Sequence, residues 1–303
     1  MRLRVIVNRG GGTLEADGGE TAQAEIRDAF ASAGVDADVR MTDPGRIGNA
    51  FDEAATAAGL DAVVAAGGDG TVSCAAARLA GGERPLGILP LGTLNHFARD
   101  AGIPAGLPEA AAAIAAGHVR EVDLGEVNGH VFVNNSAIGL YPRMVRTREE
   151  QQRFGRSRRL AMLLASLNAL RRFSRHRLTI SISGLEAPIE TPLLFVGNNR
   201  YETSLLTLGR RRALDRGELC LYAPLVRSRL RFLGLGLRGV LGFTRQRDFI
   251  ALDGVTEAEV HSRRPSLAVS ADGETLRIET PLRYRIRPGV LKLIVPAPPP
   301  AER

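Results

Sequence analysis

The sequence is poor in the residue types that define several classes of protein. Its 303 residues include two cysteines, Cys74 and Cys220, which lie far apart and without metal-type spacing. This argues against a disulfide framework and a zinc ribbon. There is no tryptophan, and aromatic residues make up only 5% of the chain, so we expect no nucleic-acid-binding surface built on aromatic stacking. The longest apolar stretches, near 160–170 and 230–243, are too short or too interrupted for the roughly 20 residues of a membrane span.

The composition that remains is that of a globular protein. Hydrophobic residues make up 44% and charged residues 24% of the chain, which is enough to bury a core. The length suggests about two domains. The residues that follow Met1 predict a strand rather than an export signal, and we therefore expect a cytoplasmic protein.

Charge is distributed unevenly along the chain. Residues 1–127 carry 10 basic and 18 acidic side chains, a net charge of −8, whereas residues 128–303 carry 30 basic and 15 acidic side chains, a net charge of +15. A basic half predicts an anionic partner: nucleic acid, a membrane surface or a phosphorylated substrate.

The first part of the chain alternates short apolar runs with alanine-rich segments of helical length. This alternation predicts right-handed βαβ units and a Rossmann-like parallel sheet covered on both faces. The predicted strands are 3–8, 35–42, 61–66, 86–89 and 119–127. The predicted helices are 21–33, 48–58, 71–79, 94–101 and 109–116.

After about residue 126 the pattern changes to many short alternating segments. A hairpin is predicted around residues 127–135, and a basic helical insertion near 143–175. The predicted strands that follow are 178–183, 191–197, 218–223, 249–252, 258–261, 266–271, 275–279, 283–288 and 290–295. Such a series indicates an antiparallel sandwich or barrel, of which we expect a β-sandwich. We predict domains at 1–126 and 127–303.

The most informative segment is the glycine-rich turn after the strand at 61–66. Gly67-Gly68-Asp69-Gly70 leads from that strand into a helix, and helix N–H groups beside glycines are suited to holding phosphates. The carboxylate of Asp69 in such a turn would repel bound phosphates unless a metal ion lay between them or the carboxylate took up a proton. The alternative is that Asp69 is a helix N-cap.

A second strand-to-helix turn follows, with Gly92, Thr93 and Asn95. Two such turns after successive parallel strands are expected at the same edge of the sheet, where open α/β folds bind ligands. The alternative is two ordinary capped helices. Further along, Asp272-Gly273 between alternating segments predicts a β-hairpin turn.

Together these segments resemble the diacylglycerol kinase catalytic domain, which bacterial lipid kinases and sphingosine kinases share. The resemblance rests on GGDGTVS (67–73) and LGILPLGTLNHFARD (86–100). It extends through VIVN (5–8), FVNNSAIG (132–139), VGNNRY (196–201), VSADGE (269–274) and PGVLKLIVP (288–296). The first string also occurs, with variations, in NAD kinases.

The resemblance implies an α/β nucleotide domain and a β-rich lipid domain with the active site between them. It implies transfer of the ATP γ-phosphoryl group to a lipid hydroxyl, with Mg²⁺. By position it implies nucleotide contacts from Thr42, Gly67, Gly68, Asp69, Gly70, Thr71, Val72, Ser73, Gly92, Thr93 and Asn95. It implies Asp69 and Asp123 in the Mg²⁺ and phosphate network, and Asp272 as proton acceptor with Glu274 beside it, so that the catalytic set is Asp272, Glu274 and Asp69.

The sequence departs from this family pattern at three places. His96 stands where the family has Asp, and Arg216 replaces a carboxylate of an accessory metal loop, so we expect that accessory Mg²⁺ site to be absent. The run 201–209 has fewer glycines and more bulk than the family has, which leaves the acceptor lipid open.

Residues 143–177 carry 11 arginines and two glutamates, with leucines at helical spacing. A basic amphipathic helix of this kind favours an anionic membrane surface, and a core-packed helix with solvated ends is the alternative.

We therefore expect an ATP-dependent lipid kinase that acts on diacylglycerol or a related lipid at the inner face of the membrane, with no nucleic-acid partner. The sequence leaves homodimer formation open. The alternatives are an NAD kinase-like enzyme and a regulator that binds nucleotide or lipid and has lost catalysis.

Overall fold

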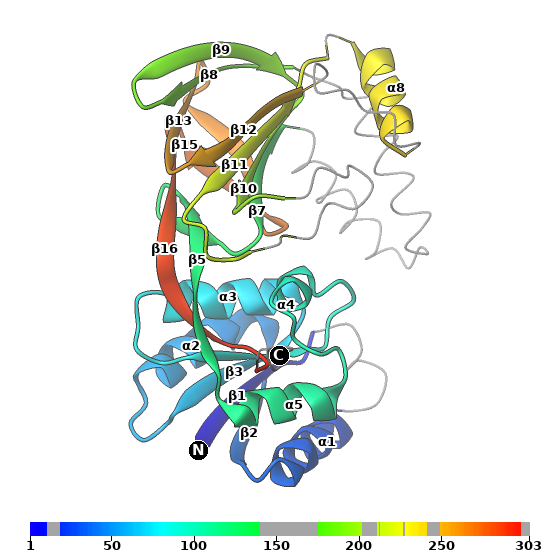
Figure 1. Cartoon of the computed structure of the whole chain (residues 1–303), viewed down its shortest axis with the longest axis vertical. Helices are drawn as coiled ribbons and strands as arrows, with labels where there is room; N and C mark the ends of the chain where they lie inside the picture. The colour runs from blue at the N-terminus through cyan, green and yellow to red at the C-terminus, as the bar shows by residue number, and fades with distance from the viewer. Residues whose placement is uncertain are drawn as a thin grey trace, which may run out of the picture. The chain divides into compact units, whose positions relative to one another are not determined.

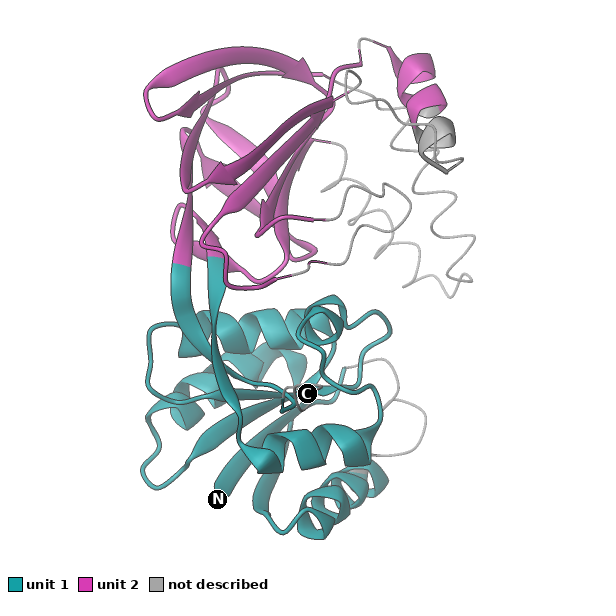
Figure 2. Cartoon of the chain, viewed as in Figure 1, with its two compact units in different colours: residues 1–124, 288–303 teal, residues 125–287 magenta. Residues whose placement is uncertain are grey.

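The computed structural model describes residues 1–10, 19–139, 175–201, 211, 213–226, 228–240 and 249–297. They form two compact units, Met1–Leu124 with Pro288–Arg303, and Gly125–Arg287 (Figure 2). Two strands, β5 (Val119–Val127) and β16 (Leu282–Ile294), run from one unit into the other. The closing stretch from Pro288 therefore belongs with the first unit, whereas the predicted division kept it with the second.

The first unit contains a parallel sheet, as predicted. Its strand order is β2-β1-β3-β4, and every pairing in this series is parallel. All six residues of β3 are buried, because a central strand of a sheet covered on both faces meets no solvent. The strands are β1 (Arg2–Asn8), β2 (Asp36–Thr42), β3 (Ala62–Gly67) and β4 (Leu86–Pro90).

Helices cover both faces of this sheet. In Figure 1, α1 and α5 lie against each other on one side of the strands, and α2 and α3 lie against each other on the other side. The helices are α1 (Gly19–Ser32), η1 (Pro44–Arg46), α2 (Ile47–Thr56), α3 (Asp69–Leu79), α4 (His96–Asp100) and α5 (Leu107–Ala116). The α/β nucleotide-domain architecture expected from the sequence is thus present.

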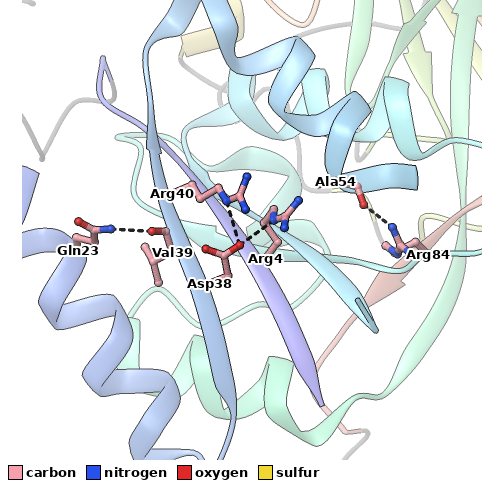
Figure 3. A network of polar contacts seen from close by, with 7 residues as sticks. All are labelled: Arg4, Gln23, Asp38, Val39, Arg40, Ala54 and Arg84. Atoms are coloured by element: carbon pink, nitrogen blue, oxygen red, sulfur yellow. Dashed lines mark hydrogen bonds and ion pairs between the residues drawn. The ribbon is translucent and has the colours of Figure 1, made fainter. Parts of the chain in front are cut away.

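Polar contacts tie the outer strand of this unit to its neighbours (Figure 3). The carboxylate of Asp38 on β2 accepts hydrogen bonds from the Nε atoms of Arg4 and Arg40, both at 3.0 Å. Gln23 of α1 donates to the carbonyl oxygen of Val39 at 2.7 Å. Side chains from α1 and β1 therefore fix β2 at the edge of the sheet.

Arg84 closes the end of α2. Its guanidinium group donates to the carbonyl oxygen of Ala54, shown in Figure 3, and to those of Ala55 at 2.8 Å and Ala57 at 2.7 Å. The last carbonyl groups of a helix have no partner within the helix. A cation placed there satisfies them and complements the helix dipole.

The second unit is built from antiparallel strands. One sheet has six strands among the described residues, in the order β12-β11-β10-β7-β14-β15. Its members are β7 (Asn135–Gly139), β10 (Leu193–Asn198), β11 (Leu219–Pro224), β12 (Phe249–Val255), β14 (Ser266–Ala271) and β15 (Glu274–Glu279).

The other layer of the unit is made by β16 and the strands that follow it in the order β16-β13-β8-β9, with β5 beside β16 and β6 beside β5. The additional strands are β6 (His130–Phe132), β8 (His176–Ile182), β9 (Leu185–Thr191) and β13 (Glu257–Ser262). Apolar side chains of both layers, such as Val260, Tyr284, Val196 and Val269, form one buried cluster. The unit is therefore the antiparallel β-sandwich that the alternating pattern predicted.

Some elements differ from the sequence prediction. Residues 283–288 and 290–295, predicted as two strands, form the single strand β16, in which Gly289 adopts a φ of 59° and lets the chain bend without ending. The edge strand β9 was not predicted. Residues 229–240, for which no element was predicted, form α8 (Arg229–Val240).

No described helix has the length and apolar character required to cross a bilayer. Most of the predicted basic insertion near 143–175 and of the run 201–209 lies outside the described residues.

Candidate active site

The first glycine-rich turn joins β3 to α3 at the carboxyl edge of the parallel sheet. Gly67 is the last residue of β3, and Asp69 is the first of α3. A Cβ on Gly67 would lie 2.5 Å from Oγ1 of Thr71, which is far inside a normal contact distance. The turn therefore requires glycine at this position for packing.

The second turn follows β4 and lies directly against the first. The N–H group of Leu91 donates to the carbonyl oxygen of Gly67 at 3.1 Å. A Cβ built on Gly92 would lie 2.4 Å from the Cα of Gly68. The two turns therefore meet at the same sheet edge, as predicted, and they approach so closely that Gly92 has no room for a side chain.

Asn95 holds the second turn in shape. It adopts a left-handed conformation with φ of 46°, which asparagine tolerates better than most residues. Its Oδ1 accepts the N–H of Gly92 at 3.0 Å, and its Nδ2 donates to the carbonyl oxygens of Pro90 at 2.9 Å and Gly92 at 2.7 Å. The side chain expected to contact nucleotide is thus engaged with its own turn.

Asp69 links the two turns. Its Oδ1 accepts the N–H of Phe97, in the first turn of α4, at 3.3 Å. The N-cap residue of α3 is Gly68. Asp69 is therefore not the N-cap of α3, which was the alternative considered from the sequence. Its carboxylate accepts a hydrogen bond from the following helix, α4, instead.

The residues after Asp69 face the interior of the unit. The side chains of Thr71 and Val72 are buried, and Oγ1 of Thr71 accepts Nδ2 of Asn8 at 2.9 Å. The N–H groups of Thr71 and Val72 both donate to the carbonyl oxygen of Gly68. The N–H groups of Asp69 and Gly70 precede these bonds, at the start of the helix where an anion is most favoured.

Thr42 and Thr93 complete the edge of the first unit. Thr42 ends β2 and pairs with Asn8 at the end of β1, next to β3 in the sheet. Thr93 is exposed on the second turn. The carboxyl ends of β2, β1, β3 and β4 thus gather the predicted nucleotide-binding residues of the first unit, whereas Asp123 lies within β5.

Two carboxylates of the first unit are candidate ligands of Mg²⁺, which is commonly held by one or two carboxylates together with substrate phosphates and water. Asp69 is partly exposed at the turn and uses Oδ1 for the bond to Phe97, so Oδ2 suits such a role. Asp123 is buried, and its Oδ1 accepts the N–H of Gly289 at 2.9 Å. Among the described residues no group of three or more His, Cys, Asp or Glu forms a metal cluster. Asp69 therefore fits the role of a carboxylate that holds a metal together with phosphates, whereas Asp123 is engaged with the main chain of β16.

Asp272 and Glu274 lie in the second unit, at the hairpin between β14 and β15. Asp272 and Gly273 have φ values of 46° and 90°, so the predicted Asp-Gly hairpin is present. Glu274 begins β15 and is exposed.

The Asp272 carboxylate is held by consecutive main-chain N–H groups. Oδ2 accepts the N–H of Val133 at 2.6 Å, and Oδ1 accepts those of Asn134 at 2.8 Å and Asn135 at 3.1 Å. Hydrogen bonds to an ionised group are stronger than neutral ones. The three donors therefore stabilise the negative charge and fix the orientation of this carboxylate.

Two residues near this hairpin were not predicted to matter. Arg211 is 3% exposed and donates to the carbonyl oxygen of Val133 at 2.6 Å. Tyr201 donates its hydroxyl to the carbonyl oxygen of Asn134 at 2.9 Å. Arg211 stands within a run of three arginines, and nothing in that run distinguishes it from its neighbours.

The residues that depart from the family pattern have local partners. Nδ1 of His96 lies 3.1 Å from a guanidinium nitrogen of Arg99. The backbone N–H of Arg216 donates to Oδ1 of Asn199 at 2.9 Å. Nearby, burial raises the pKa of the Cys220 thiol to about 11, which makes this cysteine a structural rather than a reactive group.

The structure thus combines a parallel α/β unit, which has two touching glycine-rich turns, with a β-sandwich unit. Residues 2–127 match the family model described as the diacylglycerol kinase catalytic domain. The chain is 34% identical over 303 residues to a protein of Pseudomonas aeruginosa named probable lipid kinase YegS-like, with 96% of each chain covered. The chain belongs to this diacylglycerol kinase family of lipid kinases.

Two further comparisons agree. A Mycobacterium tuberculosis protein named diacylglycerol kinase is 43% identical over 126 residues, which cover 39% of this chain and 40% of that protein. The crystal structure of a protein of Bacillus anthracis, titled a putative diacylglycerol kinase, has a TM-score of 0.75 at 24% identity and covers 97% of both chains. That structural similarity supports the fold.

Proposed function

We propose that the protein transfers the γ-phosphoryl group of ATP to the hydroxyl group of a lipid, and that this lipid is diacylglycerol or a close relative. The observation that carries the proposal is the contact between Gly68 and Gly92. It brings two loops with exposed main chain to one edge of the parallel sheet, and phosphates are commonly bound at such an edge. The names of the relatives supply the substrate class.

Backbone groups of the first unit would bind the triphosphate. The N–H groups of Asp69 and Gly70 at the start of α3, together with the main chain at Gly92 and the exposed Thr93, are the groups best suited to accept it. Thr42 would lie beside them at the end of β2. Gly67, Thr71, Val72 and Asn95 would act indirectly, because their observed contacts shape the two turns.

Asp69 would hold Mg²⁺ through Oδ2, and Asp123 would contribute negative charge to the same network. The ion, when bound, would supply positive charge that offsets the negative charge of the phosphates. The bond from Phe97 to Asp69 would keep this carboxylate in place while the second turn receives phosphate.

Asp272 would orient the acceptor hydroxyl and take its proton. The hydroxyl oxygen would bond to the γ-phosphorus while the bond from that phosphorus to the β,γ-bridging oxygen breaks, leaving ADP and a phosphorylated lipid. Phosphoryl transfer depends mainly on positioning and charge stabilisation, and the three N–H donors to Asp272 supply positioning. Glu274 would stand beside it.

The direct test is transfer of labelled phosphate from ATP with Mg²⁺ to diacylglycerol and other lipid alcohols in mixed micelles. We expect labelled lipid with the wild-type protein and a loss of at least about a hundredfold in kcat for Asp272→Asn and for Asp69→Asn. Asp36→Asn and Glu279→Gln change exposed carboxylates at other places and should keep wild-type rates.

Each other outcome has a defined meaning. Labelling of NAD instead of any lipid would replace the proposal with an NAD kinase. Mg²⁺-dependent ATP binding without turnover on any acceptor would indicate a regulator that has lost catalysis. The substitution His96→Asp, which gives the residue of the family pattern, would then be the first to test for recovery of activity. Full activity of Asp272→Asn would overturn the role given to that carboxylate.

We also propose that the protein works at an anionic membrane surface. The exposed leucine Leu230 at the start of α8 lies between the exposed arginines Arg229 and Arg231, which is the arrangement of a helix that rests on acidic headgroups. Flotation with vesicles containing an anionic phospholipid should carry the protein, and neutral vesicles should not. Leu230→Glu should reduce flotation, and equal flotation of this variant would exclude α8 from the contact.

A further inference from the structure

Arg211 is a buried cation in the β-sandwich unit. It is 3% exposed, and arginine is almost never buried to this degree unless it is paired or hydrogen-bonded. One guanidinium nitrogen donates to the carbonyl oxygens of Val133 at 2.6 Å and Asn198 at 3.2 Å, and the other donates to Oδ1 of Asn134 at 2.7 Å. The group also lies 5.4 Å from the centre of the Tyr201 ring.

One of these acceptors, the carbonyl oxygen of Val133, belongs to a peptide group that holds Asp272. The carbonyl of Val133 and the N–H of Asn134 are the two ends of one peptide group. Arg211 binds its carbonyl end, and Asp272 binds its N–H end at 2.8 Å. In a planar trans peptide these two bonds point in opposite directions, so the peptide group lies directly between the cation and the carboxylate.

The next peptide group repeats the arrangement. The carbonyl of Asn134 accepts the hydroxyl of Tyr201 and the N–H of Asn198, both at 2.9 Å, and the N–H of Asn135 donates to Asp272 at 3.1 Å. Asn198 also donates its side-chain amide to the carbonyl of Val133 at 2.9 Å. The carbonyl of Val133 thus has two donors, one of them charged, and the carbonyl of Asn134 has two neutral donors.

We propose that Arg211 is a positioning residue for Asp272, acting through the peptide groups of Val133–Asn135. A cation at a carbonyl oxygen polarises the peptide and makes its N–H a stronger donor, since hydrogen bonds in series reinforce one another. The same contacts fix the direction of the N–H groups. The inference rests on the proposed function of Asp272 and adds the residue that keeps its carboxylate in the reactive orientation.

The test compares Arg211→Met, which keeps length and removes charge, with Arg211→Lys, which keeps charge and loses the planar fork. Arg263→Met alters an exposed arginine of the same unit and is the matched control. Two readouts are needed on the full chain: the amide proton shifts of Asn134 and Asn135 by NMR, and kcat with the KM for ATP in the lipid kinase assay.

We expect the two amide protons to move upfield in Arg211→Met and part of the way in Arg211→Lys, with no change in Arg263→Met. We expect kcat to fall between about tenfold and a hundredfold in Arg211→Met, with the KM for ATP unchanged because ATP would bind the other unit. Partial recovery of kcat in Arg211→Lys is expected. A purely structural role would lower the amount of folded protein without moving kcat of the folded fraction.

Unchanged amide shifts and an unchanged kcat in Arg211→Met would overturn the inference while leaving the proposed function intact. If the wild type phosphorylates no acceptor, the proposed function fails, and the amide shifts still decide whether Arg211 acts on the N–H groups that hold Asp272. If neither Arg211 variant folds, Asp272→Asn tests the same connection between Arg211 and Asp272 by changing the carboxylate instead of the arginine. The guanidinium resonance of Arg211 should then shift, and an unchanged resonance would refute the connection.

Discussion

The contact between the two glycine-rich turns allows a sharp test, the substitution Gly92→Ala. The added Cβ would lie 2.4 Å from the Cα of Gly68, 2.7 Å from Oδ1 of Asn95 and 3.2 Å from the backbone nitrogen of Gly68. Non-bonded carbons prefer a separation of about 3.5–4.0 Å. The turns must therefore separate by about 1 Å or more, and the bonds that Asn95 makes within its turn would be strained.

We expect two measurable effects of Gly92→Ala. Overpacking of this kind costs about 1–3 kcal/mol in unfolding free energy, and urea unfolding would measure the loss. A displacement of about 1 Å at the proposed phosphate-binding edge should raise the Kd for Mg²⁺-ATP at least tenfold, since positioning errors of this size cost up to about a hundredfold. Isothermal titration calorimetry would measure this change.

Gly45→Ala is the control, because a Cβ at Gly45 meets no heavy atom within 4 Å. It should leave stability and nucleotide affinity close to those of the wild type. If Gly92→Ala behaves in the same way in both assays, the turns are not in the contact described and the proposed phosphate site loses its basis. A loss of stability without a change in ATP affinity would keep the contact and reject its role in binding.

Two further predictions concern groups outside the turns. Arg84→Ala removes the donor to three carbonyls at the end of α2 and should lower the unfolding free energy by about 2–3 kcal/mol, whereas exposed Arg27→Ala should change it by less than about 0.5 kcal/mol; equal effects in urea would reject the capping role. For Cys220, burial raises the thiol pKa from 9.0 to about 11. The folded state therefore keeps its proton longer than the unfolded state, and stability is lost as pH rises from about 9 to about 11, by roughly 2–3 kcal/mol. Cys220→Ala should lack this loss, and below pH 9 a thiol reagent should label Cys74 rather than Cys220; rapid labelling of Cys220 would contradict its burial.

Elements whose signal is local could be predicted from the sequence. The strands 119–127 and 266–271 have the same bounds in the structure as in the prediction, because their burial follows from their own residue pattern. The two glycine-rich turns and the Asp272-Gly273 hairpin were predicted for the same reason. Each depends on residues that are neighbours in the chain.

Elements that depend on distant partners were missed. Strand β9 has exposed residues over Leu185–Pro188 and a proline, so it lacks apolar alternation and becomes a strand only through its pairing with β8. In β16, the N–H of Gly289 donates to Asp123, 166 residues away in sequence. A pattern of neighbouring residues contains no information about such a bond.

The same limit applies to the inference drawn from charge. The net charge of +15 over residues 128–303 counts every arginine as available to an anionic partner. Arg211 is buried against carbonyl groups, and Arg285 and Arg287 are paired with Glu126. These side chains contact groups of the β-sandwich unit itself, so the anionic partner that we propose would be recognised by a smaller, local set of arginines. For this reason the flotation test changes an exposed residue of α8. The catalytic test changes Arg211, which the sequence does not distinguish from the two arginines beside it.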